Sequence, residues 1–198
     1  MSGSYHAIVL AAGSASRFGG GKLTAPLGEG VLLDGALEAA FAAPAGKVVV
    51  TWGADRAVAD AAWSFARAWG GKERLILAEA RDHSDGLSAS LRAGLAALPA
   101  DAAGAFLFLG DMPRVPRDVA GRLAERLADP VLAAAPLCAG VRGHPVLFSR
   151  RLFPDLAALE GDQGARRLLD GLGERLALIE TSDDGVLFDV DRPEDLCA

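Results

Sequence analysis

The segment HAIVLAAGSASRFGGGK, residues His6 to Lys22, joins a short apolar run to a glycine-rich loop that ends in a lysine. The run is typical of a buried β-strand, because it is apolar and too short for a helix. Glycines leave backbone N–H groups exposed and allow positive φ, so several donors can converge on phosphate oxygens. Arg17 adds a bidentate fork and Lys22 a point charge. The segment therefore predicts a triphosphate-binding loop, with a flexible glycine turn carrying two solvated cations as the alternative.

Two familiar phosphate-binding patterns do not fit this loop. A Walker A loop needs a glycine five positions before the glycine of its Gly-Lys pair, and a serine or threonine after the lysine. Ser16 stands at the first of these positions and Leu23 at the last. The dinucleotide fingerprint Gly-x-Gly-x-x-Gly also fails, because Ser14 and Ala15 follow Gly13. The loop is therefore neither a P-loop nor a dinucleotide-binding turn.

Apolar runs alternate with helical patterns along the rest of the chain. A strand from Ala105 ends at Asp111, and the other predicted strands are 6–12, 47–53, 74–80, 131–137, 143–149, 176–181 and 185–191. The predicted helices are 34–43, 55–69, 88–98, 117–127 and 163–172. This alternation predicts an α/β protein with a three-layer, Rossmann-like architecture, in which helices cover both faces of a mostly parallel central sheet. We see no linker, repeat or low-complexity block, so we predict one domain over residues 1–198.

The composition excludes several classes of function. The net charge of −6 argues against a nucleic-acid partner, which needs a basic face. Cys138 and Cys197 suggest neither a disulfide framework nor a zinc site. No apolar stretch approaches the length of a membrane span, and the first residues lack the basic region of a secretory signal. We therefore expect a cytoplasmic protein with no membrane partner.

The glycine-rich loop also resembles a known signature. LAAGSASRFGGGK, from Leu10 to Lys22, is similar to the pattern L-A-[AG]-G-x-S-x-R-[ML]-G-x-x-K of nucleotidyltransferases with a Rossmann-like fold. Gly13 and Arg17 are among the matching positions, and Phe18 stands where methionine is usual. The resemblance implies a nucleotidyltransferase fold whose loop holds a nucleoside triphosphate.

Later segments resemble a narrower branch of that family, in the same order. They are DGLSASLRAGLAAL from Asp85, FLFLGDMP from Phe106, GHPVLF from Gly143, GDQGARRLL from Gly161 and DVDRPEDL from Asp189. Together they are similar to the molybdenum cofactor cytidylyltransferases among the MobA-like NTP transferases, over nearly the whole chain. Ala11-Ala12-Gly13 resembles the cytidylyl branch, since the guanylyl branch usually has Ala-Gly-Gly there. Ala80 departs from the family at an asparagine that is common there, which bears on one nucleotide contact and on base choice.

The chemistry implied by this resemblance calls for a divalent cation. Two polyanions must meet and charge builds on the leaving pyrophosphate, which carboxylate-bound Mg²⁺, arginine and lysine offset. Asp111 follows a strand at the same sheet edge as the loop, and by position it is either a metal ligand or a turn residue. Asp189 and Asp191 alternate along a predicted strand and so share a face, and Asp191 can also cap a following helix. The resemblance implies Mg²⁺ held by Asp111 and, of this pair, Asp191.

The resemblance assigns further residues to three tasks. The expected catalytic residues are Arg17, Lys22 and Asp111. Nucleotide binding is expected of Leu10, Ala11, Ala12, Gly13, Ser14, Arg17, Lys22, Gly86, Leu87 and Ser88. Binding of the acceptor substrate is expected of His144, Asp162, Gly164 and Arg166. The residues alone leave alternatives open: Ser88 as a helix cap, His144 as a structural hydrogen-bonding group, and Arg166 as part of a solvated helix face.

The implied reaction is the transfer of CMP from CTP to molybdenum-bearing molybdopterin, giving molybdopterin cytosine dinucleotide and pyrophosphate. One alternative keeps the chemistry, as guanylyl transfer or as transfer to a sugar or polyol phosphate. Another is a non-catalytic carrier of the pterin cofactor, which the presence of Arg17, Lys22 and Asp111 disfavours because a carrier needs no metal–triphosphate site. The branch also implies a molybdoenzyme or its maturation factor as a partner.

Overall fold

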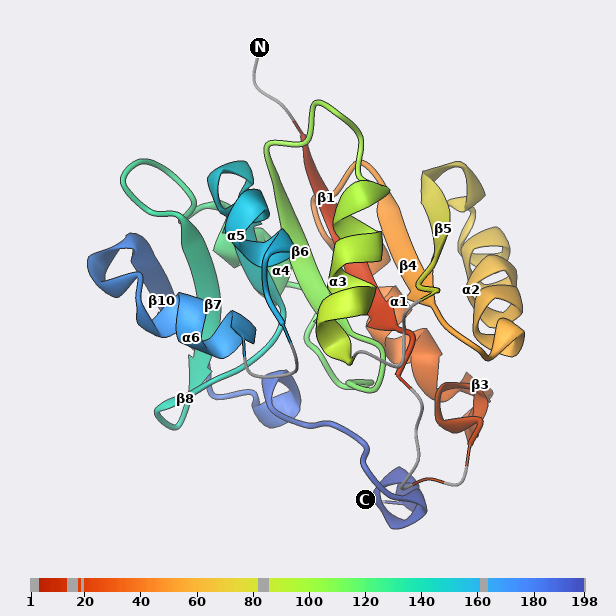
Figure 1. The fold of residues 1–198 in the computed structure, drawn as a ribbon. Coiled ribbons are helices and arrows are strands. Elements are labelled where there is room, and N and C mark those ends of the chain that lie inside the picture. The colour runs from red at the N-terminus through yellow and green to blue at the C-terminus, as the bar shows by residue number, and fades with distance from the viewer. Residues whose placement is uncertain (1–3, 14–17, 19, 82–85, 161–163, 198) are drawn as a thin grey trace.

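An eight-stranded sheet forms the centre of the computed structural model, which describes residues 4–13, 18, 20–81, 86–160 and 164–197 (Figure 1). Its strands lie in the order β10-β7-β9-β6-β1-β4-β5, and β8 pairs with β7. They are β1 (Tyr5–Ala11), β4 (Val48–Trp52), β5 (Leu75–Glu79), β6 (Gly104–Leu109), β7 (Ala133–Cys138), β8 (Val141–Arg142), β9 (Val146–Ser149) and β10 (Leu176–Glu180). β8 and β9 run antiparallel to their neighbours, and the other described pairs are parallel. The expectation of a mostly parallel sheet is confirmed.

Helices cover both faces of this sheet (Figure 1). They are α1 (Leu32–Ala42), α2 (Arg56–Trp69), α3 (Leu87–Ala96), α4 (Val119–Ala124), α5 (Phe153–Ala157) and α6 (Gly164–Asp170). Ala7 and Val9 of β1 belong to the core cluster that holds the buried residues of α1, α2 and α4. Ile8 and Leu10 belong to a second cluster with those of α3, α5 and α6. Alternate residues of β1 therefore face opposite layers, which is why the strand is apolar throughout and why the α/β architecture has three layers.

The predicted strand over 185–191 is wrong. The segment begins instead with a 3₁₀ turn, η7 (Asp184–Val186), and continues without regular structure to residue 192. The Asp183 side chain starts the turn by accepting a hydrogen bond from the Gly185 N–H at 2.9 Å. Val186 and Val190 are still buried, in the core cluster that they share with residues of α1, α2 and α4. Core packing therefore produces the apolar spacing that resembles a strand.

Other differences concern short elements. The predicted helix 117–127 is shorter in the structure, where α4 is Val119–Ala124, and the predicted strand 143–149 starts only at Val146, after a proline that has no N–H to donate. Helix α5 and the hairpin of β2 (Pro26–Leu27) and β3 (Gly30–Val31) were not predicted from the sequence. Elements this short contain too few residues to show a periodicity.

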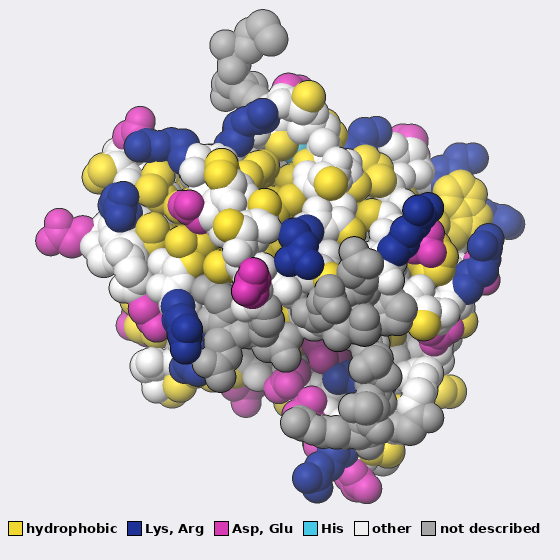
Figure 2. All heavy atoms as spheres, viewed as in Figure 1, with side chains coloured by type: hydrophobic (Ala, Val, Ile, Leu, Met, Phe, Trp, Pro, Cys, Tyr) yellow, Lys and Arg dark blue, Asp and Glu magenta, His cyan; other side chains and the backbone are white. Residues whose placement is uncertain are grey.

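The surface of the described residues mixes both signs of charge. Figure 2 shows basic and acidic side chains interspersed over the face seen in Figure 1, with apolar side chains between them. Within the described ranges, no helix has the length and apolar character needed to span a bilayer.

The turn between β7 and β8 offers a test of backbone strain. Ala139 and Gly140 both have positive φ, at 49° and 79°, in the two-residue turn that such a hairpin requires. Alanine in this left-handed region costs about 1–2 kcal/mol, and asparagine tolerates it better. We expect Ala139→Asn to raise the free energy of unfolding by about 1 kcal/mol, or Tm by about 2–4 °C, in a thermal melt. Gly140→Ala should lower Tm. If the Tm of Ala139→Asn is at or below that of wild type, the backbone at Ala139 is not strained.

Candidate active site

The site lies at the carboxyl ends of β1 and β6, which are adjacent parallel strands with Leu10 opposite Leu109. The glycine-rich loop follows β1, and the turn that carries Asp111 follows β6. The Gly110 N–H donates to the Leu10 carbonyl at 2.9 Å, so the turn begins directly beside the start of the loop. Loops at this edge of a parallel sheet are where α/β proteins bind ligands. The predicted meeting of the loop and Asp111 is therefore confirmed.

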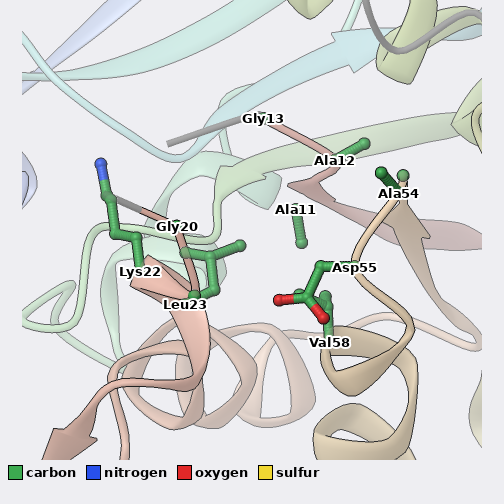
Figure 3. Close-up of a pocket in the computed structure, with 11 residues that line it drawn as sticks. Ala11, Ala12, Gly13, Gly20, Lys22, Leu23, Ala54, Asp55 and Val58 are labelled. Atoms are coloured by element: carbon green, nitrogen blue, oxygen red, sulfur yellow. The ribbon is translucent and has the colours of Figure 1, made fainter. Parts of the chain in front are cut away.

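A cavity of about 290 Å³ opens beside the loop. Its lining comes from Ala11 to Gly13, Gly20 to Leu23, Gly53 to Asp55, and Val58 (Figure 3). No motif in the sequence predicted Gly53–Asp55 as part of the site, although these residues follow β4, which pairs with β1 on its other side. Asp55 also caps α2, because its Oδ1 accepts a hydrogen bond from the Ala57 N–H at 3.0 Å. Small apolar residues and glycines make up most of the described wall, and Lys22 and Asp55 are its charged side chains. Glycines at a cavity wall let backbone N–H groups approach phosphate oxygens.

The expected nucleotide-binding residues are only partly brought together. Ala11, Ala12, Gly13 and Lys22 line this cavity. The Leu10 side chain packs in the core instead, and Ser88 is buried in the first turn of α3. Gly86 precedes α3, and Leu87 lines a different cavity. Ser14 and Arg17 lie outside the described residues.

Lys22 is held by two of the predicted acids. Its Nζ lies 2.7 Å from Asp111 Oδ2 and 3.9 Å from Asp191 Oδ1. The Lys22 side chain is only 10% exposed, against 28% for Asp111 and 55% for Asp191. Lys22 starts the 3₁₀ helix η2 (Lys22–Thr24), which the left-handed Gly21 precedes. The structure thus forms one charged cluster from Lys22 of the glycine-rich loop and from Asp111 and Asp191, which are distant from it in sequence.

The C-terminal segment brings its acids to this cluster through backbone hydrogen bonds. The Val190 N–H donates to the Asp111 carbonyl at 3.0 Å, between Asp189 and Asp191 in the chain. The idea that these two acids share the face of a strand is wrong, because the segment is irregular. Asp195 Oδ2 accepts hydrogen bonds from the N–H groups of Asp191 and Arg192 at 2.9 and 2.8 Å, which holds the backbone where the turn η8 (Pro193–Cys197) begins.

Asp189 shows that negative charge accumulates here. Burial raises the pKa of the Asp189 carboxyl, and the neighbouring charges of Asp191 and Asp111 raise it further. Lys22 acts in the opposite direction and lowers the Asp189 pKa. The hydrogen bonds that the Asp195 carboxylate accepts from the N–H groups of Arg192 and Asp191 lower its own pKa. Like charges that destabilise one another favour the binding of a cation.

A second, larger cavity of about 810 Å³ opens beside Asp189. Met112 and Asp189, which lie close to Asp111 and Asp191 in the chain, are among its lining residues, and much of its wall is aliphatic. Its polar lining comes from Arg142, His144, Arg166, Asp170 and Asp189. Arg142 Nη2 and Asp170 Oδ1 form an ion pair at 2.6 Å, which joins β8 to the end of α6. The cavity is large enough for a bulky organic substrate with an anionic group.

Of the expected acceptor-binding residues, His144 and Arg166 line this second cavity. His144 is buried, and its Nδ1 lies 3.5 Å from the Leu107 carbonyl oxygen. Burial lowers the pKa of the imidazole, more than that carbonyl and the Asp111 charge raise it, so the ring is neutral at pH 7. Gly164 begins α6, and Asp162 lies outside the described residues.

Comparisons with known proteins agree with this arrangement. Residues 7–177 match the model of the MobA-like NTP transferase domain. The chain is 30% identical to the purine catabolism protein PucB of Bacillus subtilis (strain 168), over 95% of this chain and 92% of that protein. It is 24% identical to the molybdenum cofactor cytidylyltransferase of Escherichia coli (strain K12), over 95% of this chain and 91% of that protein.

A solved structure shows the same fold. The crystal structure of Rv0371c from Mycobacterium tuberculosis H37Rv superposes with a TM-score of 0.78, at 29% identity, over 98% of this chain and 96% of that one. The same protein has been solved in complex with manganese, with a TM-score of 0.72 at 26% identity, over 91% and 89% of the two chains. Because the family model covers most of the chain, the chain belongs to the MobA-like NTP transferase domain family and is a nucleotidyltransferase.

Proposed function

We propose that the protein transfers CMP from CTP to molybdenum-bearing molybdopterin, releasing pyrophosphate. The observation that carries this proposal is that Lys22, which lines the smaller cavity, pairs with Asp111 and Asp191, whose near neighbours in the chain, Met112 and Asp189, line the larger one. The smaller cavity, beside the glycine-rich loop, suits the nucleotide. The larger cavity suits the acceptor.

The acids fit a magnesium ion. Asp111 and Asp191 offer carboxylate oxygens, and both already attract the Lys22 ammonium group. Among the described residues, no three histidine, cysteine, aspartate or glutamate side chains are placed to hold a metal ion together. Mg²⁺ needs fewer, since it keeps several waters and binds proteins through one or two carboxylates plus substrate phosphates. The manganese complex of the Mycobacterium tuberculosis relative supports a divalent cation here.

The residues of the chain then have distinct tasks. The acceptor is a phosphate monoester, which is already anionic, so attack on the α-phosphorus of CTP needs no strong general base. The phosphorus–oxygen bond to the acceptor forms as the bond to pyrophosphate breaks. Lys22 and Arg17 neutralise charge on the triphosphate and on the leaving pyrophosphate. The bound cation supplies Lewis-acid stabilisation of the phosphoryl oxygens, and Asp111 and Asp191 fix its position.

The choice of substrates rests on separate observations. Cytidine is supported by the Ala11-Ala12-Gly13 sequence and by the similarity to the molybdenum cofactor cytidylyltransferase of Escherichia coli. That relative also supports molybdopterin as the acceptor. The aliphatic wall of the larger cavity favours a bulky acceptor over a small sugar phosphate, and Arg166 offers a cation for its phosphate.

A turnover assay tests the proposal. The protein is incubated with Mg²⁺, CTP and molybdenum-bearing molybdopterin, and the dinucleotide and pyrophosphate are quantified. We expect equal amounts of both products, with CTP preferred over GTP, ATP and UTP. Parallel reactions contain a sugar phosphate or a polyol phosphate as the acceptor. Turnover of those acceptors and none of molybdopterin would overturn the proposed acceptor. A preference for GTP would overturn the proposed nucleotide.

A further inference from the structure

Lys22 is a nearly buried cation that depends on acids for its charge balance. Its side chain is 10% exposed, and its Nζ lies 2.7 Å from Asp111 Oδ2 and 3.9 Å from Asp191 Oδ1. Lys22 also lines the smaller cavity, where Figure 3 shows it on the opposite side from Asp55. The ammonium group therefore lies within reach of both the acids and the proposed triphosphate site.

The ammonium group and a divalent cation compete for the same carboxylates. Mg²⁺ binds carboxylate oxygens at about 2.0–2.1 Å, so it competes with the Lys22 ammonium group for Asp111 Oδ2 and Asp191 Oδ1. Two neighbouring cations also repel each other. For the metal to bind these two oxygens, Lys22 Nζ must leave them.

Lys22 needs another anion if it is to leave. A largely buried charge that loses its partner is strongly destabilising, because desolvation is then uncompensated. In the nucleotide-free protein, departure from Asp111 carries that cost. A triphosphate bound in the smaller cavity supplies new anionic oxygens to the same ammonium group.

We propose that Lys22 is a resident counter-cation, which occupies Asp111 and Asp191 in the nucleotide-free protein and moves to the triphosphate as a divalent cation replaces it. The proposal rests on the proposed function. Its consequence is that nucleotide and metal strengthen each other's binding by the same factor. Without nucleotide, Lys22 keeps the affinity for divalent cations low.

Titration of the nucleotide-free protein with Mn²⁺ tests this exchange, with free Mn²⁺ followed by electron paramagnetic resonance. Lys22→Met removes the charge at similar length, and Lys22→Gln is a second variant in case the first does not fold. Arg192→Met is the matched control, because Arg192 adjoins Asp191 in the chain and is exposed. We expect both Lys22 variants to bind Mn²⁺ at least about tenfold more tightly than wild type, within the usual range of coupling. Arg192→Met should change the affinity by less than about threefold, as expected for a screened surface charge.

Three results would overturn the proposal. They are unchanged or weaker Mn²⁺ binding in the folded Lys22 variants, no detectable Mn²⁺ binding in them, and an equal gain in Arg192→Met. The readout is the metal affinity of the nucleotide-free protein and does not involve turnover. If the Lys22 variants do not bind Mn²⁺ more tightly, the proposal of CTP-dependent transfer is unaffected. If the protein does not turn over CTP, the measured competition between Lys22 and Mn²⁺ is likewise unaffected.

Discussion

Replacing Asp111 with asparagine is expected to lower kcat/KM for nucleotidyl transfer by about three orders of magnitude, or about 4 kcal/mol of transition-state stabilisation. Asparagine keeps the shape of the side chain and removes its charge. Asp111 is the acid closest to Lys22, and it follows β6 at the edge where the loop begins. The substitution therefore weakens the hold on the divalent cation and deprives Lys22 of its nearest anion.

A steady-state assay with a coupled pyrophosphate readout measures this effect, and a thermal melt verifies that the variant is folded. Asp118→Asn is the matched control, since Asp118 is an exposed aspartate at the start of α4 that pairs with Arg122. The control should keep wild-type activity. Removing one group that stabilises the transition state typically lowers activity by about 100-fold or more. If Asp111→Asn keeps activity within about threefold of wild type, the role assigned to the acids is therefore wrong. A wild-type protein that shows no turnover, together with pterin binding that is the same in Asp111→Asn as in wild type, would instead indicate a carrier.

Gly35→Ala is expected to disturb both stability and the site. A Cβ at Gly35 would lie 2.6 Å from the Cα of Pro113, which belongs to the turn that carries Asp111. Helix α1 therefore packs with its backbone directly against that turn. Overpacking costs about 1–3 kcal/mol, and rigid backbone atoms favour the upper end, which outweighs the gain of about 1 kcal/mol in helix propensity. We expect Tm to fall by about 4–8 °C, from a net loss of about 2 kcal/mol.

The same substitution should also lower kcat, because Asp111 moves with its turn. A displacement of about 1 Å in a catalytic group can cost about 100-fold in rate. Gly121→Ala is the matched control: Gly121 lies in α4, and a Cβ there would meet no atom within 4 Å. That variant should keep its activity and gain up to about 1 kcal/mol of stability. Equal shifts of Tm in the two variants would show that α1 does not press on the turn.

The sequence was sufficient to predict the sheet and the meeting of the loop with Asp111. Buried parallel strands are continuous apolar runs, and their carboxyl ends share an edge, so β1 and β6 could be placed from pattern alone. The residues Gly53–Asp55 could have been found by the same reasoning, since they follow the neighbouring strand β4.

Other features of the site depend on long-range contacts that no local pattern encodes. The C-terminal segment has the alternation of a strand, but Val186 and Val190 alternate because they pack into the core. Its attachment to the Asp111 carbonyl brings Asp191 toward Lys22, across most of the chain length. The ion pair between Lys22 and Asp111 likewise joins residues 89 positions apart. Such pairings emerge only when the packed strands bring their loops together.

The most direct test of the central claim is the thermal stabilisation of the protein by CTP, GTP, ATP and UTP, each with and without Mg²⁺. A ligand that binds only the folded state adds about 2.7 kcal/mol at 100 times its Kd, which a melt resolves clearly. We predict a selective, magnesium-dependent rise of Tm with CTP. No stabilisation by any of the four nucleotides, with or without the acceptor present, would contradict the assignment of the loop and its acids to nucleotide transfer.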